Sequence, residues 1–370
     1  MKGWVVRGDG ETRDVFHEED VPEPSPELLD GLKMDLAGWV TDPASFGIED
    51  PAEHDLFATR RTAAAARPPY EDWVMLRVKV AALGLPDVTM ARGTYPVRVA
   101  RPYVSGQEAV GEVVGAPPER VDLIGRRVVA VTMQPWGSLA PMSIGVGPVF
   151  EVPDGMDDTD AAGFVIPAHT GYHAAIRRGG VRAGETVVVL GAAGGLGSAM
   201  VQLSAAQGAS VVAVVGSEDK AAFASSLGAE HVAIHTGDDV ATAVRAAIGS
   251  TPVDVVLDPV QGTMGPQSRA LLRPNGRWVL CGHAGTLRPI DPSFYMQNLT
   301  LVGATLGGYD RDTMRAIEQE TQDAFVQLWK EGRFKSVTTR SIGFDEVPDA
   351  LTAMSQRETI GRVVVNVSDQ

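Results

Sequence analysis

The residues with the clearest chemical meaning form a glycine-rich run, Gly191-Ala192-Ala193-Gly194-Gly195-Leu196-Gly197. An apolar run at 186–190 precedes it, and a pattern that places Leu196, Met200 and Leu203 on one helix face follows it. A diphosphate can rest on the N–H groups at a helix N-terminus only where no Cβ stands in the way. The strand, glycine turn and helix therefore predict a dinucleotide-binding site. An ordinary glycine turn is the alternative.

The second strand of this unit, 211–215, indicates which dinucleotide binds. It ends at Gly216-Ser217, with Lys220 three residues further on. A hydroxyl and an ammonium group suit a ribose 2′-phosphate, whereas a carboxylate would repel it. Glu218 and Asp219 also lie here, where they suit the N-terminal turn of a helix. These residues favour NADPH over NADH, although Ser217 can also be only a helix N-cap.

The same alternation of strands and helices continues toward the C-terminus. Helical patterns cover 221–227 and 240–248, and apolar strand patterns cover 232–234, 253–257, 277–281 and 299–302. Together with the strands at 186–190 and 211–215, they predict an α/β fold with a doubly wound parallel sheet. Such a sheet binds ligands outside the carboxyl ends of its strands.

The N-terminal part has a different character. Strand patterns at 1–6, 76–80, 111–114 and 127–131 are separated by Gly/Pro turns, which indicates a small β-rich domain resembling a partly open barrel. We predict one domain from 1–157 together with 310–370, to which a helix at 312–330 and a strand at 362–367 return the chain. The dinucleotide-binding domain covers 158–309. Residues 25–70 form an unusually long connection, either a lid over a substrate site or a surface excursion.

Composition excludes several classes of function. The net charge of −15, without a dense Lys/Arg run, argues against binding to nucleic acid or to an anionic membrane. The single cysteine, Cys281, excludes an internal disulfide, and no general base stands beside it to make it a nucleophile. The sequence has no apolar run of transmembrane length and no N-terminal apolar signal region, so we predict a cytoplasmic protein.

From Trp73 onward the chain resembles the medium-chain dehydrogenase/reductase superfamily, in its zinc-free quinone oxidoreductase and enoyl reductase branch. The resemblance is carried by motifs in a fixed order: Gly93-Thr94-Tyr95-Pro96, Gly106-Gln107-Glu108, Pro167-Ala168-His169-Thr170-Gly171-Tyr172, the glycine run, Gly216-Ser217-Glu218-Asp219-Lys220 and Gly361-Arg362-Val363-Val364. It implies a Rossmann domain and a GroES-like barrel domain.

The resemblance also bears on metal binding. The positions that hold catalytic zinc ligands in the alcohol dehydrogenases of this superfamily are Gly84, Gln107 and Ile166 here, and none offers a sulfur or imidazole donor. His169 and His173 have a spacing that suits a metal. We expect instead that one packs or caps near the nucleotide and that the other lies on the helix surface. We predict no metal site.

The resemblance assigns roles to individual residues. It implies hydride transfer from NADPH to quinones, α,β-unsaturated ketones or enoyl thioesters as small-molecule substrates. Tyr95 is the candidate catalytic donor to the substrate oxygen; an aromatic wall is the alternative. The implied cofactor residues are Thr170 for the nicotinamide ribose, Ala193, Gly194, Gly195, Leu196 and Gly197 for the pyrophosphate, Ser217, Lys220 and His235 for the adenosine phosphate, Gly282, His283, Thr305 and Leu306 for the nicotinamide, and Arg362 for a phosphate.

Two of these assignments have alternatives, since His235 can be a surface turn residue and Arg362 a solvated arginine at a strand end. The resemblance further implies a homodimer formed through the strand at 298–302. An NADPH-binding protein of the same fold without physiological turnover is the alternative function. A narrower version of the NADPH-dependent reductase is a biosynthetic enzyme that the 25–70 insertion shapes for one dedicated substrate.

Overall fold

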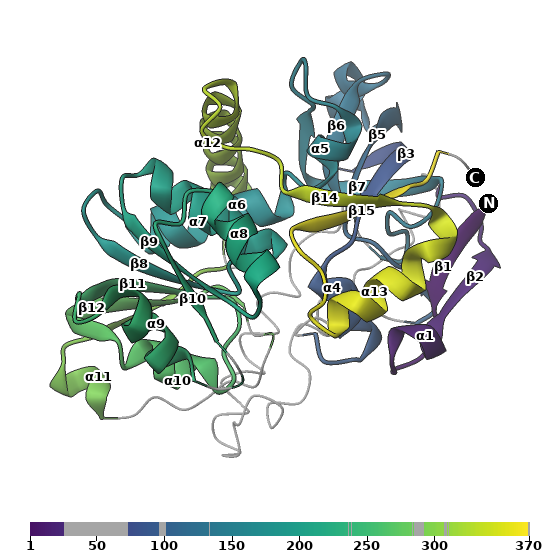
Figure 1. Ribbon diagram of the computed structural model, residues 1–370. Coiled ribbons are helices and arrows are strands. Elements are labelled where there is room, and N and C mark those ends of the chain that lie inside the picture. Colours follow the sequence, from purple (N-terminus) through teal and green to yellow (C-terminus); the bar gives the residue numbers. More distant parts are fainter. Residues whose placement is uncertain are drawn as a thin grey trace, which may run out of the picture. The chain divides into compact units, whose positions relative to one another are not determined.

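The computed structural model in Figure 1 describes residues 1–25, 73–95, 101–132, 134–235, 237, 239–282, 284, 292–306, 309 and 311–368. The long connection predicted at 25–70 lies almost wholly outside the described residues, and so does His283. The chain divides into two compact units. The first comprises Met1–Gly163 and Thr338–Gln370, and the second comprises Phe164–Val337. In the described part of the chain, no helix combines the length and the apolar character needed to cross a membrane.

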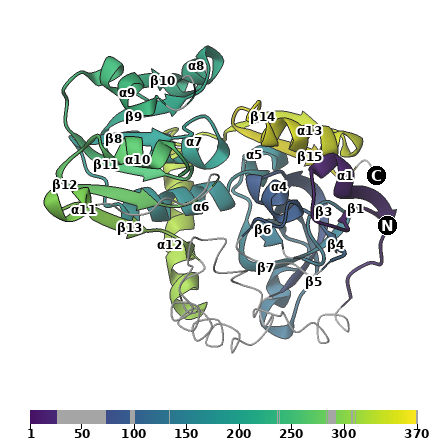
Figure 2. The same ribbon diagram turned by 90° about the horizontal axis from the view of Figure 1, so that it is seen from below.

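The second unit contains the predicted parallel sheet, in the strand order β10-β9-β8-β11-β12-β13 (Figures 1 and 2). All neighbouring strands in it are parallel, and the order changes direction at β8, so the sheet is doubly wound. The strands are β8 (Thr186–Leu190), β9 (Ser210–Val215), β10 (His231–Ile234), β11 (Val253–Asp258), β12 (Leu272–Leu280) and β13 (Thr300–Gly303).

The central strands of this sheet are buried on both faces because helices cover each side. In β8, Val187 and Val189 face one core, and Val188 and Leu190 face the other. The first core includes residues of η4 (His173–Arg178), α7 (Gly195–Ala206) and α8 (Glu218–Ser226). The second includes residues of α9 (Val240–Ile248) and α10 (Met264–Arg269). The alternation explains why the sequence shows continuous apolar runs at these strands.

The boundary predicted near residue 310 is wrong, because the long helix α12 (Arg311–Lys330) groups with the second unit. Its Phe325 ring lies 5.6 Å from the ring of Phe164 and 4.7 Å from that of Phe334. On the neighbouring turn, Gln322 Oε1 lies 2.9 Å from Nε2 of His169 in α6 (Ile166–Tyr172). These buried contacts hold α12 against α6, so the chain returns to the first unit only at Thr338.

The first unit is built on a six-stranded sheet in the order β14-β15-β3-β5-β6-β7. The first half of β3 also pairs with β7, so that β3, β5, β6 and β7 close on themselves as a small barrel. This confirms the predicted β-rich domain. The strands are β3 (Val74–Ala82), β5 (Glu108–Gly115), β6 (Arg127–Thr132), β7 (Met142–Glu151), β14 (Thr338–Ile342) and β15 (Arg362–Asn366).

A three-stranded sheet, β2-β1-β4, completes the strands of this unit. It contains β1 (Lys2–Val6), β2 (Phe16–Asp20) and β4 (Tyr103–Val104). The helices of the first unit are α1 (Thr12–Val15), α4 (Leu85–Ala91), η3 (Pro118–Leu123), α5 (Asp158–Ala162), η6 (Phe344–Glu346) and α13 (Val347–Ser355), and α11 (Ser293–Met296) completes the second unit. Buried residues of β1, β3, α4, β5 and α13 share one core.

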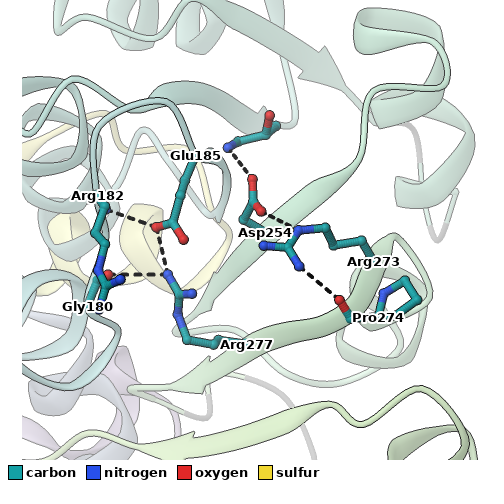
Figure 3. A network of polar contacts seen from close by, with 8 residues as sticks. Gly180, Arg182, Glu185, Asp254, Arg273, Pro274 and Arg277 are labelled. Atoms are coloured by element: carbon teal, nitrogen blue, oxygen red, sulfur yellow. Dashed lines mark hydrogen bonds and ion pairs between the residues drawn. The ribbon is translucent and has the colours of Figure 1, made fainter.

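Charged side chains join the amino ends of β8, β11 and β12 (Figure 3). The Asp254 carboxylate accepts a hydrogen bond from the Thr186 N–H at 2.8 Å and pairs with Arg273. Beside it, the Glu185 carboxylate accepts hydrogen bonds from the Arg182 N–H at 2.9 Å and from Arg277 at 2.7 Å. The network thus fixes the edge of the sheet opposite to the carboxyl ends.

We expect Asp254→Ala to lower the free energy of unfolding of the second unit by about 1–3 kcal/mol, because the buried Thr186 N–H loses its acceptor. Arg273→Met is the control. It removes an ion pair whose arginine is 40% exposed, and such a pair contributes about 0–1 kcal/mol. Thermal unfolding of the two variants checks this order. Equal destabilisation would mean that the ion pair, not the backbone contact, carries the effect.

Candidate functional site

The glycine turn lies between β8 and α7, where a dinucleotide-binding turn is predicted. Gly191 has a φ of +61°, which favours glycine, and Gly194 is the N-cap of α7. A Cβ on Gly197 would lie 2.1 Å from the carbonyl oxygen of Gly191. A Cβ on Gly194 would meet only that same oxygen, at 3.5 Å, so the turn leaves space in front of the helix. The first N–H groups of a helix have no intrahelical acceptor, and this opening suits a pyrophosphate.

Three predicted adenosine-phosphate residues come together at the carboxyl ends of β9 and β10. Ser217 caps α8, and its hydroxyl accepts a hydrogen bond from the Lys220 N–H at 3.4 Å. Ser217 is therefore the N-cap of α8 and is exposed, and its contact with a 2′-phosphate stays a prediction. The His235 N–H donates to Val215 O at 3.0 Å, which fixes His235 beside the end of β9.

The protonation of the His235 ring follows from a second contact. Its Nδ1 lies 2.9 Å from the carbonyl oxygen of Gly237, which can only accept a hydrogen bond. Nδ1 therefore carries a proton, and the other edge of the ring presents Nε2. The exposed Ser217, the half-buried Lys220 and the half-buried His235 offer one hydroxyl, one ammonium and one imidazole edge. The hydroxyl and the ammonium group can donate to a 2′-phosphate. His235 adds a donor only as an imidazolium, because Nε2 of a ring protonated at Nδ1 alone accepts hydrogen bonds.

Thr170 lies on α6, which packs closely on α7. A Cβ on Gly171 would stand 3.2 Å from Cβ of Ala199, so the glycine allows the two helices to approach. Thr170 is half-buried on the exposed side of this contact. Its neighbour His169 is buried, stacks on Phe325 and has its pKa lowered to about 4 by burial, so the ring is neutral.

The expectation that one of the two histidines lies on a helix surface is wrong. His169 and His173 are each 1% exposed. The His173 ring packs edge-on against Tyr309 at 5.5 Å, and burial lowers its pKa to about 4. The i and i+4 spacing places both on the side of the helix that faces the second unit's interior. Among the described residues, no cluster of three His, Cys, Asp or Glu side chains is arranged to hold a metal ion.

The predicted nicotinamide residues follow β12 and β13. Gly282 lies two residues after the end of β12, and a Cβ there would stand 2.7 Å from the carbonyl oxygen of Pro259. The Ala304 N–H donates to Leu280 O at 2.9 Å, so Thr305 and Leu306 begin beside the end of β12. Cys281 lies 3.8 Å from the sulfur of Met200, and burial raises the pKa of its thiol, as expected for a small apolar residue.

Tyr95 belongs to the first unit, in the turn after α4. The Thr94 and Tyr95 N–H groups donate to Thr89 O at 2.9 and 3.1 Å, and the half-buried Tyr95 side chain packs against the core. Burial raises the pKa of its phenol, and the negative charge of Asp87 raises it further. The phenol therefore keeps its proton at neutral pH and can donate a hydrogen bond.

Sequence reasoning missed how firmly the N-terminal segment holds this turn. Arg92 forms two hydrogen bonds with the Glu11 carboxylate, at 3.0 and 2.6 Å. Arg101, beyond the turn, pairs with Asp9 and donates to Met90 O at 2.9 Å. The only signal in the sequence is the acidic character of residues 9–20, which does not reveal its partners.

Asp87 lies in the first turn of α4 in the first unit, together with Gly84 and Gln107 of the positions discussed for zinc, whereas Ile166 lies on α6 in the second unit. The Asp87 carboxylate accepts hydrogen bonds from Gly84 N–H at 2.9 Å, Gly106 N–H at 3.0 Å and the Ser105 hydroxyl at 3.1 Å. Burial raises the pKa of Asp87, and these donors oppose the shift. Gln107 donates to the sulfur of Met90 at 3.0 Å. The described donors here are carboxylate and amide oxygens and the thioether of Met90, without a thiolate or an imidazole, and this set does not fit zinc.

Arg362 has a partner that the sequence did not indicate. Its guanidinium forms an ion pair with Glu108 at 2.7 Å, with the side chains 9% and 0% exposed. The arginine is thus buried in the first unit, so the solvated-arginine alternative is wrong. Contact with a cofactor phosphate stays a prediction. The other predicted cofactor residues belong to the second unit. Those that the structure describes lie after the carboxyl ends of strands or at the start of α7, except Thr170, which lies on α6.

Comparisons with known proteins agree with this arrangement. Two family models match: alcohol dehydrogenase GroES-like domain over residues 70–147, and zinc-binding dehydrogenase over residues 195–323. The quinone oxidoreductase-like protein 2 homolog of Nematostella vectensis is 26% identical over 297 residues, which cover 79% of this chain and 81% of that protein. A phenolphthiocerol/phthiocerol polyketide synthase of Mycobacterium tuberculosis is 27% identical over 306 residues, which cover 81% of this chain but 14% of that protein.

A solved structure extends the likeness to the whole chain. The quinone oxidoreductase of Thermus thermophilus, whose structure was also determined in complex with NADPH, is 27% identical and has a TM-score of 0.69. The match covers 99% of this chain and 100% of that chain.

We predict that Glu108→Met and Arg362→Met each destabilise the first unit by about 3–5 kcal/mol, because each leaves one buried charge without its partner. The double variant removes both charges of this pair, so its loss should be smaller than the sum of the two. Denaturant unfolding of the three variants measures this. The idea fails if Arg362→Met leaves stability unchanged and weakens only NADPH binding.

Proposed function

We propose that this chain, which belongs to the medium-chain dehydrogenase/reductase superfamily, reduces quinones or activated C=C bonds with NADPH and without zinc. Two features, one in each unit, carry the proposal. The second unit presents an open helix N-terminus at the carboxyl ends of a parallel sheet. The first unit presents a phenol that keeps its proton, near carboxylates that lack a zinc donor set.

The second unit supplies binding. The N-terminus of α7 holds the pyrophosphate, and Ser217, Lys220 and His235 hold the 2′-phosphate. Thr170, Gly282, Thr305 and Leu306 border the nicotinamide half. When bound, NADPH supplies a hydride from its nicotinamide ring. The neutral state of His169 beside Thr170 adds no positive charge to this end of the site.

The first unit supplies the proton donor. A substrate that accepts hydride at a carbon conjugated with a carbonyl group gains negative charge on its oxygen. Tyr95 donates a hydrogen bond to that oxygen, and its raised pKa keeps the phenol in the donating form. The contacts from Thr89 and from the Glu11–Arg92 pair hold the turn that carries it. No metal is needed to polarise the oxygen.

The names of the relatives support the substrate class. One relative is called quinone oxidoreductase-like, one solved neighbour is a quinone oxidoreductase, and one relative is a polyketide synthase. Quinones and enoyl thioesters both carry a C=C bond in conjugation with a carbonyl group. The same hydrogen-bond donor to the substrate oxygen would serve both.

We also propose a homodimer formed through β13. This strand is an edge of the parallel sheet, and Leu301 on it is 38% exposed. Tyr295 and Met296, on the preceding helix α11, are 74% and 72% exposed. An uncovered strand edge beside large apolar side chains favours pairing with a second copy.

The reaction can be tested by NADPH consumption at 340 nm with a naphthoquinone, an enone and an enoyl thioester. We expect turnover with at least one of them and about a 10²-fold lower kcat for Tyr95→Phe, with unchanged NADPH affinity. Phenylalanine keeps the ring, so an aromatic wall would leave kcat unchanged. NADPH binding without turnover on all three acceptors would instead support the cofactor-binding protein without turnover.

Cofactor choice can be tested at Lys220. We expect Lys220→Ala to weaken NADPH binding by about ten- to a hundredfold, because a hydrogen bond between charged groups is lost. NADH lacks the 2′-phosphate, so its affinity should not change. Lys220→Arg keeps the charge and serves as control. Calorimetry with both dinucleotides decides, and equal loss for the two would show that Lys220 does not read the 2′-phosphate.

The dimer can be tested by light scattering after size exclusion. We expect the wild-type chain to have twice its 39.1 kDa mass and Leu301→Asp to shift it toward the monomer, because a charge at a paired edge is desolvated. Val121→Asp is the matched control, since Val121 is also exposed, at 56%, but lies on η3 of the first unit. A monomeric wild type, or equal loss in both variants, contradicts the β13 interface.

A further inference from the structure

Asp258, the last residue of β11, carries a fully buried carboxylate. Its Oδ1 accepts hydrogen bonds from the N–H groups of Val260 at 2.8 Å and Gln261 at 2.7 Å. Its Oδ2 accepts one from Nε1 of the buried Trp278 at 3.0 Å. A buried carboxylate is costly unless donors surround it, and here both oxygens have donors. Asp258 therefore ties its own turn to β12.

The turn after Asp258 is strained. Gln261 has a φ of +61° and is 1% exposed, although it is not a glycine. Such a conformation costs free energy and persists only where the surroundings impose it. The two N–H groups that point at one carboxylate oxygen impose it here. Asp258 thus holds the turn in a conformation that Gln261 does not favour by itself.

This turn joins the two neighbouring loops of the nucleotide-binding edge. A Cβ on Gly191, at the start of the glycine turn, would stand 3.2 Å from Cγ2 of Val260. On the other side, a Cβ on Gly282 would stand 2.7 Å from Pro259 O, and the Cys281 N–H donates to Asp258 O at 3.1 Å. The carboxyl ends of β8, β11 and β12 therefore meet at residues 259–261.

We infer that Asp258 is a positioning residue for the dinucleotide site: through Val260 and Pro259 it fixes the glycine turn at Gly191 and the loop at Gly282. It does so without reaching solvent or cofactor, because its side chain is buried beneath the turn. The inference rests on the proposed NADPH site. Asp258 thereby influences the affinity for NADPH, although it is not among the residues expected to touch the cofactor.

The test uses two variants of the same strand. Asp258→Asn keeps an oxygen for the two backbone N–H groups but turns an NH₂ group toward the Trp278 N–H, so that two donors face each other. Asp254→Asn is the matched control. Asp254 also accepts a hydrogen bond from a backbone N–H and pairs with the Arg273 side chain, but it lies at the opposite end of β11. We expect both to lower the melting temperature and only Asp258→Asn to weaken NADPH binding, by about tenfold.

A second substitution tests the mechanism. Trp278→Phe removes the facing donor, so Asp258→Asn combined with Trp278→Phe should bind NADPH within about threefold of Trp278→Phe alone. Hydrogen exchange in the cofactor-free protein gives an independent readout. Amides at 191–197 should exchange faster in Asp258→Asn and regain protection in the double variant.

Each outcome is decisive. If Asp258→Asn binds NADPH as tightly as Asp254→Asn, or if exchange at 191–197 does not change, the positioning role is wrong. If the wild-type chain does not bind NADPH, the proposed function fails, while exchange at 191–197 still judges whether Asp258 holds the turn. If Asp258→Asn does not fold, Trp278→Phe alone must weaken NADPH binding by about threefold, since it removes the donor to one oxygen.

Discussion

The close approach of backbone to backbone at the glycine turn is the constraint on which the second unit depends. A helix can begin directly at the end of β8 only because Gly197 brings no Cβ against the carbonyl oxygen of Gly191. This contact sets where α7 starts, and therefore where its N–H groups point. The sheet then brings the ends of β9, β11 and β12 to the same edge. In the described part of this unit, every residue expected to bind the dinucleotide lies after a strand of this sheet or at the start of α7, except Thr170 on α6.

Buried charge organises the rest of the molecule. Asp87, Glu108 and Asp258 are almost without exposure, and each has N–H, O–H or guanidinium donors at hydrogen-bond distance. Because an unpaired buried carboxylate is unstable, each of them fixes the groups that surround it. Asp87 joins α4 to the start of β5, Glu108 joins β5 to β15, and Asp258 joins β11 to β12. The backbone of both units is thus held by a few polar contacts inside apolar cores.

The same contacts explain where sequence reasoning fails. The sequence pattern assigns helix α12 to the first unit because the helix follows the last strand of the parallel sheet. Its Phe325 and Gln322 instead contact α6, and a linear pattern does not say which surface an amphipathic helix covers. One of His169 and His173 is expected at a surface, yet both are buried, because their spacing places them on the same side of the helix. The alternative of a solvated Arg362 fails because its buried partner, Glu108, is 254 residues away in the sequence.

The sequence alone determined the parallel sheet, the glycine turn and the cluster of Ser217, Lys220 and His235. These features depend on local patterns: apolar runs bounded by turns, a helix start without Cβ atoms, and residues that directly follow strands. Only the tertiary structure decided which buried charges pair, which unit holds α12, and how residues 259–261 connect three strand ends. Those contacts join residues that are far apart in the chain. Which residues make these contacts depends on the path of the folded backbone. A buried charged group pairs with the partner that this path brings within hydrogen-bond distance.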